Sequence, residues 1–591
     1  MIFSPPFSAF SCLRERLLAG LVILLISAPL LALEVQVEVL GVSGELEENI
    51  RAHLAILQVA DPARLTAGRL RRLHARAEAQ IRAALEPFGY YQAEVDARLS
   101  QEQGRKGHWR ARYEIRPGAP ARVVRVNYVL SGEGAQDDVF PADFGLAEGE
   151  VLDHRRYEAA RDALLLAAAE RGYLDAVYRV NRVTVDPIGN TAEVHIEFDT
   201  GPRYFFGPVD FDQTLLDEDI MRRFVRFDAG DPYDQNRLLR LQTSLLDAQY
   251  FQRVSVEPQT EKTDPDTNQV PLTVHAEPAK PNKFRVGLGF ATDTGPRVTF
   301  DWQRRYFGRR GHRGEVTLQL SPVLQQLSGE YRIPLERVTT EYVLINPELY
   351  RYKTDTRFVQ SAHVDVHQSV VRDGWRRNLG IEYRYEDYDL GEEEEDVDEL
   401  VPYVTYSKTA TDSLIYATRG YRLKLSLLGA IDGLVSPASY AQLSVSGKWV
   451  RSVAEDYRFI ARADLGATLA DSVNDLPASR RFFAGGDHSM RGYQLDDLGP
   501  RDPDSGDILG GRFLGVGSLE LERRLRGKWS AAVFYDFGNA YDPDLDNEFA
   551  QSVGAGVRWL SPVGQVRVDV GVGIDDEDTP VRLHVIIGPD L

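Results

Sequence analysis

The second half of the chain alternates apolar and polar residues in one segment after another, and this pattern constrains the fold more than any other feature. In the first such segment, residues 283–290, every second residue is apolar: Phe284, Val286, Leu288 and Phe290. Successive side chains of a strand point to opposite faces, so each segment has one apolar and one polar face. After residue 33 no apolar run is long enough to cross a bilayer as a helix. The pattern is typical of a transmembrane β-barrel.

Sixteen alternating segments follow one another to the C-terminus. They begin near residues 283, 296, 312, 324, 338, 356, 374, 400, 419, 439, 456, 513, 528, 551, 564 and 580. An even number of strands returns both ends of a barrel to one side of the membrane. The longer connections, at 389–399, 471–512, 541–550 and 575–579, all follow odd-numbered strands. We therefore predict a 16-stranded antiparallel transmembrane β-barrel at residues 281–591, with its long loops facing outward.

The N-terminus has the composition of a secretory signal peptide. Two arginines precede an apolar run from Leu17 to about Leu31, and small residues near Ala32 follow. The run is too short for a membrane anchor, which takes about 20 residues. We predict that residues 1–32 are removed, and that Cys12, the one cysteine of the sequence, leaves with them. The mature chain then has neither a disulfide nor a thiolate site.

Between the signal peptide and the barrel, one pattern of strands and helices recurs three times. Each unit is interpreted as β-α-α-β-β. The units share a helix-exit signal at Gly89-Tyr90, Gly172-Tyr173 and Gln249-Tyr250, where a left-handed residue suits the end of a helix. Pro/Gly hinges close the units, and we predict three domains at 33–118, 119–202 and 203–280.

Charge and motifs argue against several functions. The formal net charge is −20, which disfavours nucleic acid as a partner. The sequence has no phosphate-binding loop, no Gly-x-Ser-x-Gly elbow and no His-Glu-x-x-His, so we do not expect an enzyme. The acidic run at 392–399 is interpreted as a solvated loop, the stretch 542–548 lacks the glycine of a calcium loop, and the Asp487-His488 pair is interpreted as incidental. We predict no metal and no cofactor.

The longest loop, 471–512, carries Arg491-Gly492-Tyr493. Alternation places Asp536 and Phe534 on the inner face of the strand that begins near 528, and it places Glu520 on the inner face of the preceding strand. A planar guanidinium suits a carboxylate partner. We expect the loop to fold back on the barrel wall near these carboxylates.

These residues resemble the superfamily of BamA, TamA and the two-partner-secretion transporters. The resemblance rests on Arg491-Gly492-Tyr493 in a long loop, Phe534-Tyr535-Asp536 on the thirteenth strand, and a sixteen-stranded barrel behind repeats that resemble POTRA domains. The number of repeats, the lead-in 482–486 and the segment 557–564 are similar to the TamA branch. The resemblance implies that Arg491 bonds Asp536 inside the lumen and holds the loop there. Such a pair either braces the barrel or takes part in handling clients.

The resemblance also implies a location and partners. The barrel would lie in the bacterial outer membrane with the POTRA domains in the periplasm. It would be the outer-membrane component of the translocation and assembly module and help to insert or secrete outer-membrane proteins such as autotransporters. It would contact outer-membrane lipid and a TamB-like protein that is anchored in the inner membrane and spans the periplasm. A BamA-like general insertase and a two-partner-secretion-type pore stay open as alternatives, although the repeat number and the lack of a plug helix argue against the pore.

The barrel must close by pairing its first and last strands, 284–291 and 581–587. Glycines in the first strand predict weak pairing at this seam, and an open edge could template a client strand by main-chain hydrogen bonds. A crosslink between cysteines at Val286 and Val585 is expected to block such opening. The predicted seam residues are Phe284, Val286, Gly287, Gly289, Leu583, Val585 and Ile587.

Overall fold

The computed structural model describes residues 33–588 except 60–64, 103–106, 414, 546–547, 562–563 and 576–580. The predicted signal peptide, 1–32, lies outside the described residues. The chain divides into two compact units: one holds the residues up to Phe206 with two short later segments, and the other holds the remainder, including the barrel. None of the helices in the described residues is long and apolar enough to cross a membrane.

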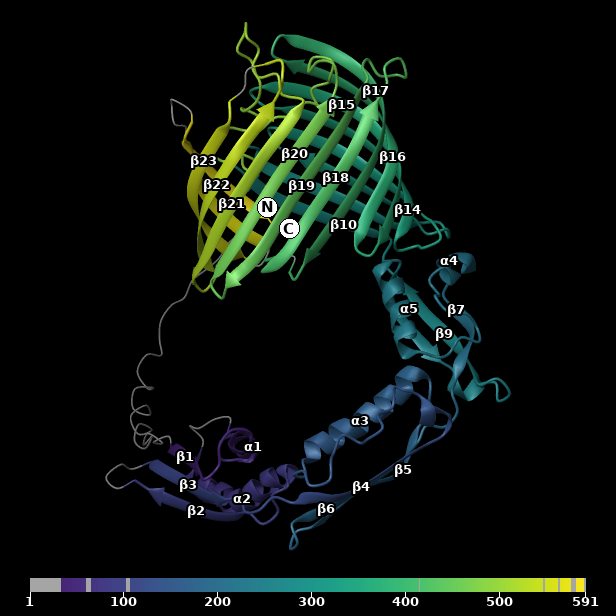
Figure 1. Cartoon of the computed structure of the whole chain (residues 1–591), viewed down its shortest axis with the longest axis vertical. Coiled ribbons are helices and arrows are strands. Elements are labelled where there is room, and N and C mark those ends of the chain that lie inside the picture. The colour runs from purple at the N-terminus through teal and green to yellow at the C-terminus, as the bar shows by residue number, and fades with distance from the viewer. Residues whose placement is uncertain are drawn as a thin grey trace, which may run out of the picture. The chain divides into compact units, whose positions relative to one another are not determined.

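Three small sheets precede the barrel (Figure 1), and each has the last strand of its unit in the middle, in the orders β1-β3-β2, β4-β6-β5 and β7-β9-β8. In the first two sheets the opening strand runs parallel to the central strand and the other strand runs antiparallel to it. The first unit contains β1 (Glu34–Leu40), α1 (Glu45–His53), α2 (Ala67–Leu85), β2 (Glu94–Gln101) and β3 (His108–Arg116). The second contains β4 (Arg122–Ser131), α3 (His154–Arg171), β5 (Val177–Asp186) and β6 (Thr191–Asp199). The third contains β7 (Phe205–Asp212), α4 (Glu218–Arg222), α5 (Gln235–Asp247), β8 (Phe251–Pro258) and β9 (Gln269–Pro278).

The second unit departs from the predicted β-α-α-β-β order. It has one α-helix, α3, and a short 3-10 turn at Glu133–Gln136 before it. Pro141, Gly145 and Gly149 lie in the segment where a first helix would stand, and both residue types disfavour helix. The irregular segment still contributes buried side chains, including Phe140 and Phe144, to the core under the sheet.

The barrel is a closed sheet of sixteen strands in chain order, β10 to β25, and neighbouring strands are antiparallel. The predicted strand number is therefore confirmed. The strands are β10 (Asn282–Ala291), β11 (Gly295–Phe307), β12 (His312–Leu320), β13 (Leu324–Pro334), β14 (Glu341–Lys353), β15 (Arg357–Arg372), β16 (Trp375–Leu390), β17 (Glu393–Thr411), β18 (Arg419–Ala430), β19 (Tyr440–Ala454), β20 (Tyr457–Leu469), β21 (Phe513–Arg526), β22 (Trp529–Tyr541), β23 (Ala550–Ser561), β24 (Gly564–Gly573) and β25 (Val581–Gly588).

The alternation correctly assigns the two faces of the wall. Outward side chains such as Val286 and Leu288 are 70% and 83% exposed, as expected for a surface that meets lipid. Inward charged side chains such as Arg558 and Glu522 are each 1% exposed. The lumen near β21–β24 is thus filled by charged groups rather than by water alone.

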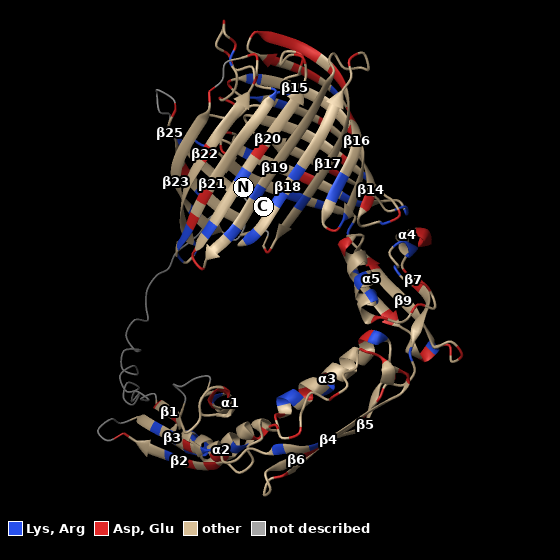
Figure 2. Cartoon of the chain, viewed as in Figure 1, with Lys and Arg blue, Asp and Glu red and all other residues tan. Residues whose placement is uncertain are grey.

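One predicted loop is wrong. Residues 393–399 of the acidic run belong to β17, which pairs with β16 up to Leu390↔Glu393, and Figure 2 shows acidic residues along the upper end of the barrel. The charges are compatible with a strand because Glu399, which is fully buried, bonds to an arginine of the long loop, while Glu394 and Asp396 are exposed. The solvated-loop interpretation therefore fails for the inward half of the run.

Candidate functional site: the long loop and the barrel seam

The loop between β20 and β21 folds back on the inner wall, and Arg491 bonds to that wall through its side chain and its backbone. Its Nε and Nη2 atoms donate to the two carboxylate oxygens of Asp536 at 2.9 and 2.8 Å, and its backbone N–H donates to Oδ2 at 3.1 Å. Its Nη1 donates to Glu520 Oε2 at 2.7 Å. Arg491 is 5% exposed and Asp536 is fully buried. The structure thus brings together the three charged residues that the sequence nominated.

The plane of the guanidinium also has an aromatic partner. The Arg491 Cζ atom lies 3.4 Å from the centroid of the Phe534 ring, and Arg–aromatic stacking of this kind is strengthened by desolvation. Ser518, which the sequence did not single out, accepts from Arg491 at 3.1 Å and donates to Asp536 at 2.6 Å. Asp536, Glu520, Ser518 and Phe534 all lie on β21 and β22, so these two neighbouring strands provide the main contacts of the Arg491 side chain.

The pair belongs to a larger buried network. Glu520 also accepts from Arg558 Nη2 at 2.8 Å, and Asp569 contacts both Arg558 and Arg491. Burial alone would lower the pKa of Arg491, but the hydrogen bonds and charges of Asp536 and Glu520 outweigh it and hold that pKa above its ordinary value. Removing one member would leave an opposite charge buried without compensation.

The two residues after Arg491 pack closely against β23 and β24. A Cβ atom on Gly492 would lie 2.5 Å from the backbone nitrogen of Gly573 on β24, so only glycine fits there. The hydroxyl of Tyr493 donates to the backbone oxygen of Gln551 at 3.2 Å. Gly571, which sequence reasoning missed, makes the matching approach from the wall, because its Cβ would lie 2.3 Å from the Arg491 oxygen.

The loop has further anchors that sequence reasoning missed. Arg480 donates to Glu382 on β16 at 2.8 Å and to Glu399 on β17 at 3.1 Å. Arg357 on β15 pairs with Asp496 of the loop at 3.0 Å. Inward-facing acidic residues on β16 and β17 were a signal for such partners, but alternation alone does not say which loop residue reaches them.

The seam between β10 and β25 differs from the prediction. Across the described residues these strands share one backbone pair, Ala291↔Ile586, whereas β10 pairs with β11 from Asn282↔Arg304 to Ala291↔Gly295. One side-chain bond adds to it, from the Val585 N–H to Thr292 Oγ1 at 2.6 Å. In this register Val286 is not opposite Val585, so the predicted crosslink pair is wrong.

The predicted seam residues mostly face away from any partner across the seam. Phe284, Leu583 and Ile587 are 62%, 54% and 40% exposed on the outer surface, and the atoms nearest to a Cβ on Gly287 or Gly289 would be side-chain atoms of Thr299 at 3.6 Å and of Arg297 at 3.3 Å. The glycines are therefore not required by crowding. The weak pairing follows from the register, which brings the two strands together only at one end.

Comparisons with known proteins identify the family of the chain. The model of the Omp85 superfamily domain matches residues 280–589, which is more than half of the chain. The chain belongs to the Omp85 superfamily. Residues 36–117 match a family described as POTRA domain, TamA domain 1, and residues 204–279 match a POTRA family described as surface antigen variable number repeat.

Two of the curated relatives that match are named outer membrane protein assembly factor BamA. The chain is 26% identical over 388 residues to the outer membrane protein assembly factor BamA of Nitratidesulfovibrio vulgaris, a match that covers 61% of this chain and 47% of the relative. It is 23% identical over 393 residues to BamA of Neorickettsia risticii, covering 60% of this chain and 50% of that protein. The chain thus spans about half the length of the curated relatives it matches. Like these homologues, it is an outer-membrane β-barrel with periplasmic POTRA domains.

A solved structure shares the fold. The BamA structure from Haemophilus ducreyi that lacks POTRA domains 1–3 superposes with a TM-score of 0.69 at 14% identity, covering 79% of this chain and 99% of that one. At this identity the likeness supports the fold alone.

In this Omp85 barrel the long loop, rather than β10, bonds the inner face of β25. His584 Nε2 lies 2.5 Å from the backbone oxygen of Arg491, and Arg582 donates to Gln494 of the loop at 3.2 Å. The same loop approaches the other side of the seam, where the Asp487 N–H donates to Asp293 in the turn after β10. Side chains of β25 and of the turn after β10 contact the loop, which therefore connects the two strands that barely pair with each other.

Proposed function

We propose that this Omp85 protein is the outer-membrane component of a translocation and assembly module, and that it helps to insert or secrete outer-membrane proteins such as autotransporters through the seam between β10 and β25. The observation that carries the proposal is that Ala291↔Ile586 is the single backbone pair across the seam among the residues that the structure describes. Where strands lack a partner, their N–H and C=O groups are left unsatisfied, which is costly in lipid. A client strand that pairs with such an edge removes that cost.

In this proposal Arg491 acts by holding the long loop in place. Its bonds to Asp536 and Glu520 fix the loop on β21 and β22, and the loop in turn holds His584 and Arg582 of β25. The lock residues Arg491, Gly492, Tyr493, Asp536, Phe534 and Glu520 therefore set how β25 is presented at the seam.

A crosslink tests the seam. The sole cysteine, Cys12, lies in the predicted signal peptide, so two introduced cysteines have no competitors in the mature chain. We expect Ala291→Cys with Ile586→Cys to form a disulfide that blocks assembly of an outer-membrane β-barrel client, with recovery in reductant. The matched control is Val570→Cys with Leu583→Cys, which joins β25 to its regular neighbour β24 and is expected to leave assembly intact. Full assembly with the seam crosslinked would refute the proposed opening.

A TamB-like partner is the second part of the proposal. It is supported by the match of residues 36–117 to the TamA domain 1 family, which lies within the first domain as we propose it, 33–118; the other proposed domains are 119–202, 203–280 and 281–591. A pull-down from detergent-solubilised envelopes is expected to recover a large periplasm-spanning protein anchored in the inner membrane, and deletion of 36–117 is expected to lose it.

The same pull-down distinguishes the alternatives. Recovery of the lipoproteins of the main barrel-assembly complex, in place of the periplasm-spanning protein, would favour a BamA-like general insertase. Recovery of one secreted protein would favour a two-partner-secretion-type pore. Either result would replace the proposed module while leaving the seam to be judged by the crosslink.

A further inference from the structure

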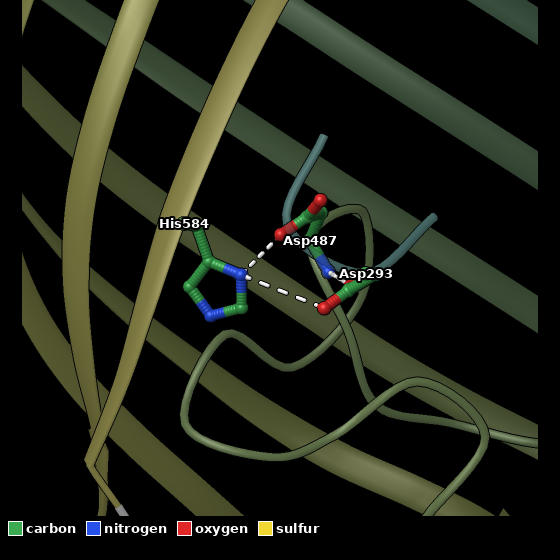
Figure 3. A group of neighbouring side chains, drawn as sticks. All are labelled: Asp293, Asp487 and His584. Carbon is green, nitrogen blue, oxygen red and sulfur yellow. Dashed lines mark hydrogen bonds and ion pairs between the residues drawn. The ribbon is translucent and has the colours of Figure 1, made fainter. Parts of the chain in front are cut away.

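Three side chains from distant parts of the chain meet beside the seam: Asp293 from the turn after β10, Asp487 from the long loop, and His584 from β25 (Figure 3). One ligand-type atom from each lies within 4.8 Å of the others. His584 Nδ1 is 3.9 Å from Asp293 Oδ1 and in close contact with Asp487 Oδ1. The three side chains are 2%, 11% and 4% exposed for His584, Asp293 and Asp487, respectively.

The second nitrogen of His584 determines what Nδ1 offers. Nε2 lies 2.5 Å from the backbone oxygen of Arg491, and a carbonyl oxygen accepts only, so Nε2 must carry a proton. In the neutral ring Nδ1 then has a lone pair that faces two carboxylate groups. Nδ1 is in hydrogen-bonding contact with Asp487 Oδ1, so either a proton or a metal ion on Nδ1 can bridge the ring and the carboxylates. A histidine whose far N–H donates to a backbone carbonyl is also the usual arrangement at metal sites.

A separate observation points to a missing partner. Asp487 Oδ2 is buried and has no hydrogen-bond partner among the described residues. A buried carboxylate oxygen without a partner is costly. A cavity of about 740 Å³ lined by Asp293, Asp487 and residues of the lumen wall lies beside the group, so an ion and its water ligands have a path to it.

We propose that Asp293, Asp487 and His584 form a binding site for a divalent transition-metal ion of the zinc class, which ties the first hairpin, the long loop and the last strand together. One imidazole nitrogen and two carboxylate oxygens are ligands that zinc accepts, and water supplies the fourth position. Ligand atoms of a tetrahedral zinc ion lie roughly 3.3 Å apart. The His584–Asp293 pair, at 3.9 Å, therefore has to close by about 0.6 Å to reach that separation, and Asp487 has to withdraw slightly from Nδ1.

The proposal departs from the expectation that the chain binds no metal. Sequence reasoning weighed Asp487 together with its neighbour His488, because adjacent residues are visible in a sequence. The structure pairs Asp487 with a histidine 97 positions later. His488 is exposed and is not a member of the group.

Metal binding by the full chain in detergent tests the site. The protein is purified without a histidine tag, stripped with a chelator, and titrated with Zn²⁺ by calorimetry and with Co²⁺ by visible absorption. We expect one tight ion per chain and the absorption of low-symmetry Co²⁺. In His584→Gln the affinity of this site is expected to fall by about tenfold or more, since a ligand is lost, whereas His488→Gln, the matched control, is expected to bind as the original protein does.

Folding and metal loss are separated by heat-modifiable migration, which reports whether the barrel is closed. If His584→Gln fails that check, Asp293→Asn, a substitution in the turn outside the strands, carries the same expectation. Undetectable Zn²⁺ binding by the original protein would overturn the proposal, and so would equal affinity in the original protein and in a folded His584→Gln or Asp293→Asn variant.

Discussion

The two sides of this barrel are joined by different means. On the wall at β15–β17, backbone ladders run without a break from Arg357↔Leu390 to Arg372↔Trp375 and from Trp375↔Lys408 to Leu390↔Glu393. At the seam one backbone pair joins β10 and β25 in the described residues. There the long loop connects the two strands through contacts with their side chains and with the turn after β10.

The difference indicates which of the two joints a single residue or ligand can change. A backbone ladder depends little on which side chains it carries, and its bonds form and break together. A joint made of side chains depends on a few residues, so one substitution or one ligand can change it. The loop contacts both regions through arginines, Arg480 on the β16–β17 wall and Arg491 near the seam, which allows the two regions to be compared within one chain.

The largest effect is expected for Arg491→Ala. It leaves Asp536 and Glu520 buried without the arginine that pairs with both of them, and breaking a buried charge pair costs roughly 3–5 kcal/mol. The loop should then release the inner face of β25. We expect lower client assembly at matched barrel levels and faster hydrogen exchange in β25.

Arg480→Ala provides the comparison. It leaves Glu399 and Glu382 without their loop partner in the same way. These two residues lie on β17 and β16, which are held together by an unbroken backbone ladder. We expect a similar loss of thermal stability with little change in β25 exchange or client assembly. Equal loss of assembly in both variants would mean that Arg491 only braces the barrel.

A smaller effect is expected for Gly571→Ala on β24. The new methyl group would lie 2.3 Å from the Arg491 oxygen, and backbone on both sides leaves little room to adjust, so about 1–3 kcal/mol of stability should be lost. Gly515→Ala on β21 is the control, because its Cβ would have no neighbour closer than 3.9 Å. The temperature at which each barrel loses its heat-modifiable form measures the difference, and equal temperatures would contradict the tight approach.

The sequence predicted much of the barrel because a strand exposed to lipid on one face must alternate. Strand number, the inward position of Asp536 and Glu520, and the lipid-facing position of Val286 all follow from a period of two. The register at the seam does not, because alternation is unchanged when one strand slides past another by an even number of residues. The roles of Gly571, Arg480 and His584 depend on where a long loop folds back, and neighbouring residues carry no periodic signal for that.

The prediction for the acidic start of β17 was wrong for a related reason. Consecutive acidic residues indicate solvent when they are considered alone, but Arg480 of the loop and the Tyr440 hydroxyl on β19 both bond to Glu399 and make its burial acceptable. A charge pattern therefore predicts a face only when its partner is nearby in the sequence.

The smallest effect is expected for Arg582→Gln on β25. The half-buried Arg582 gives one hydrogen bond to Gln494 of the loop at 3.2 Å, and such a bond contributes about 0.5–1.5 kcal/mol. If the loop and not β10 holds this strand, losing the bond should raise the open population of the seam about fivefold, since about 1 kcal/mol separates the two cases. Hydrogen exchange of the β25 amides in detergent measures that population. Leu583→Ala changes the adjacent residue on the outer face of the same strand and should leave the exchange rates as they are. Faster exchange in Leu583→Ala than in Arg582→Gln would show that contact with lipid or detergent, rather than the loop, keeps the last strand in place.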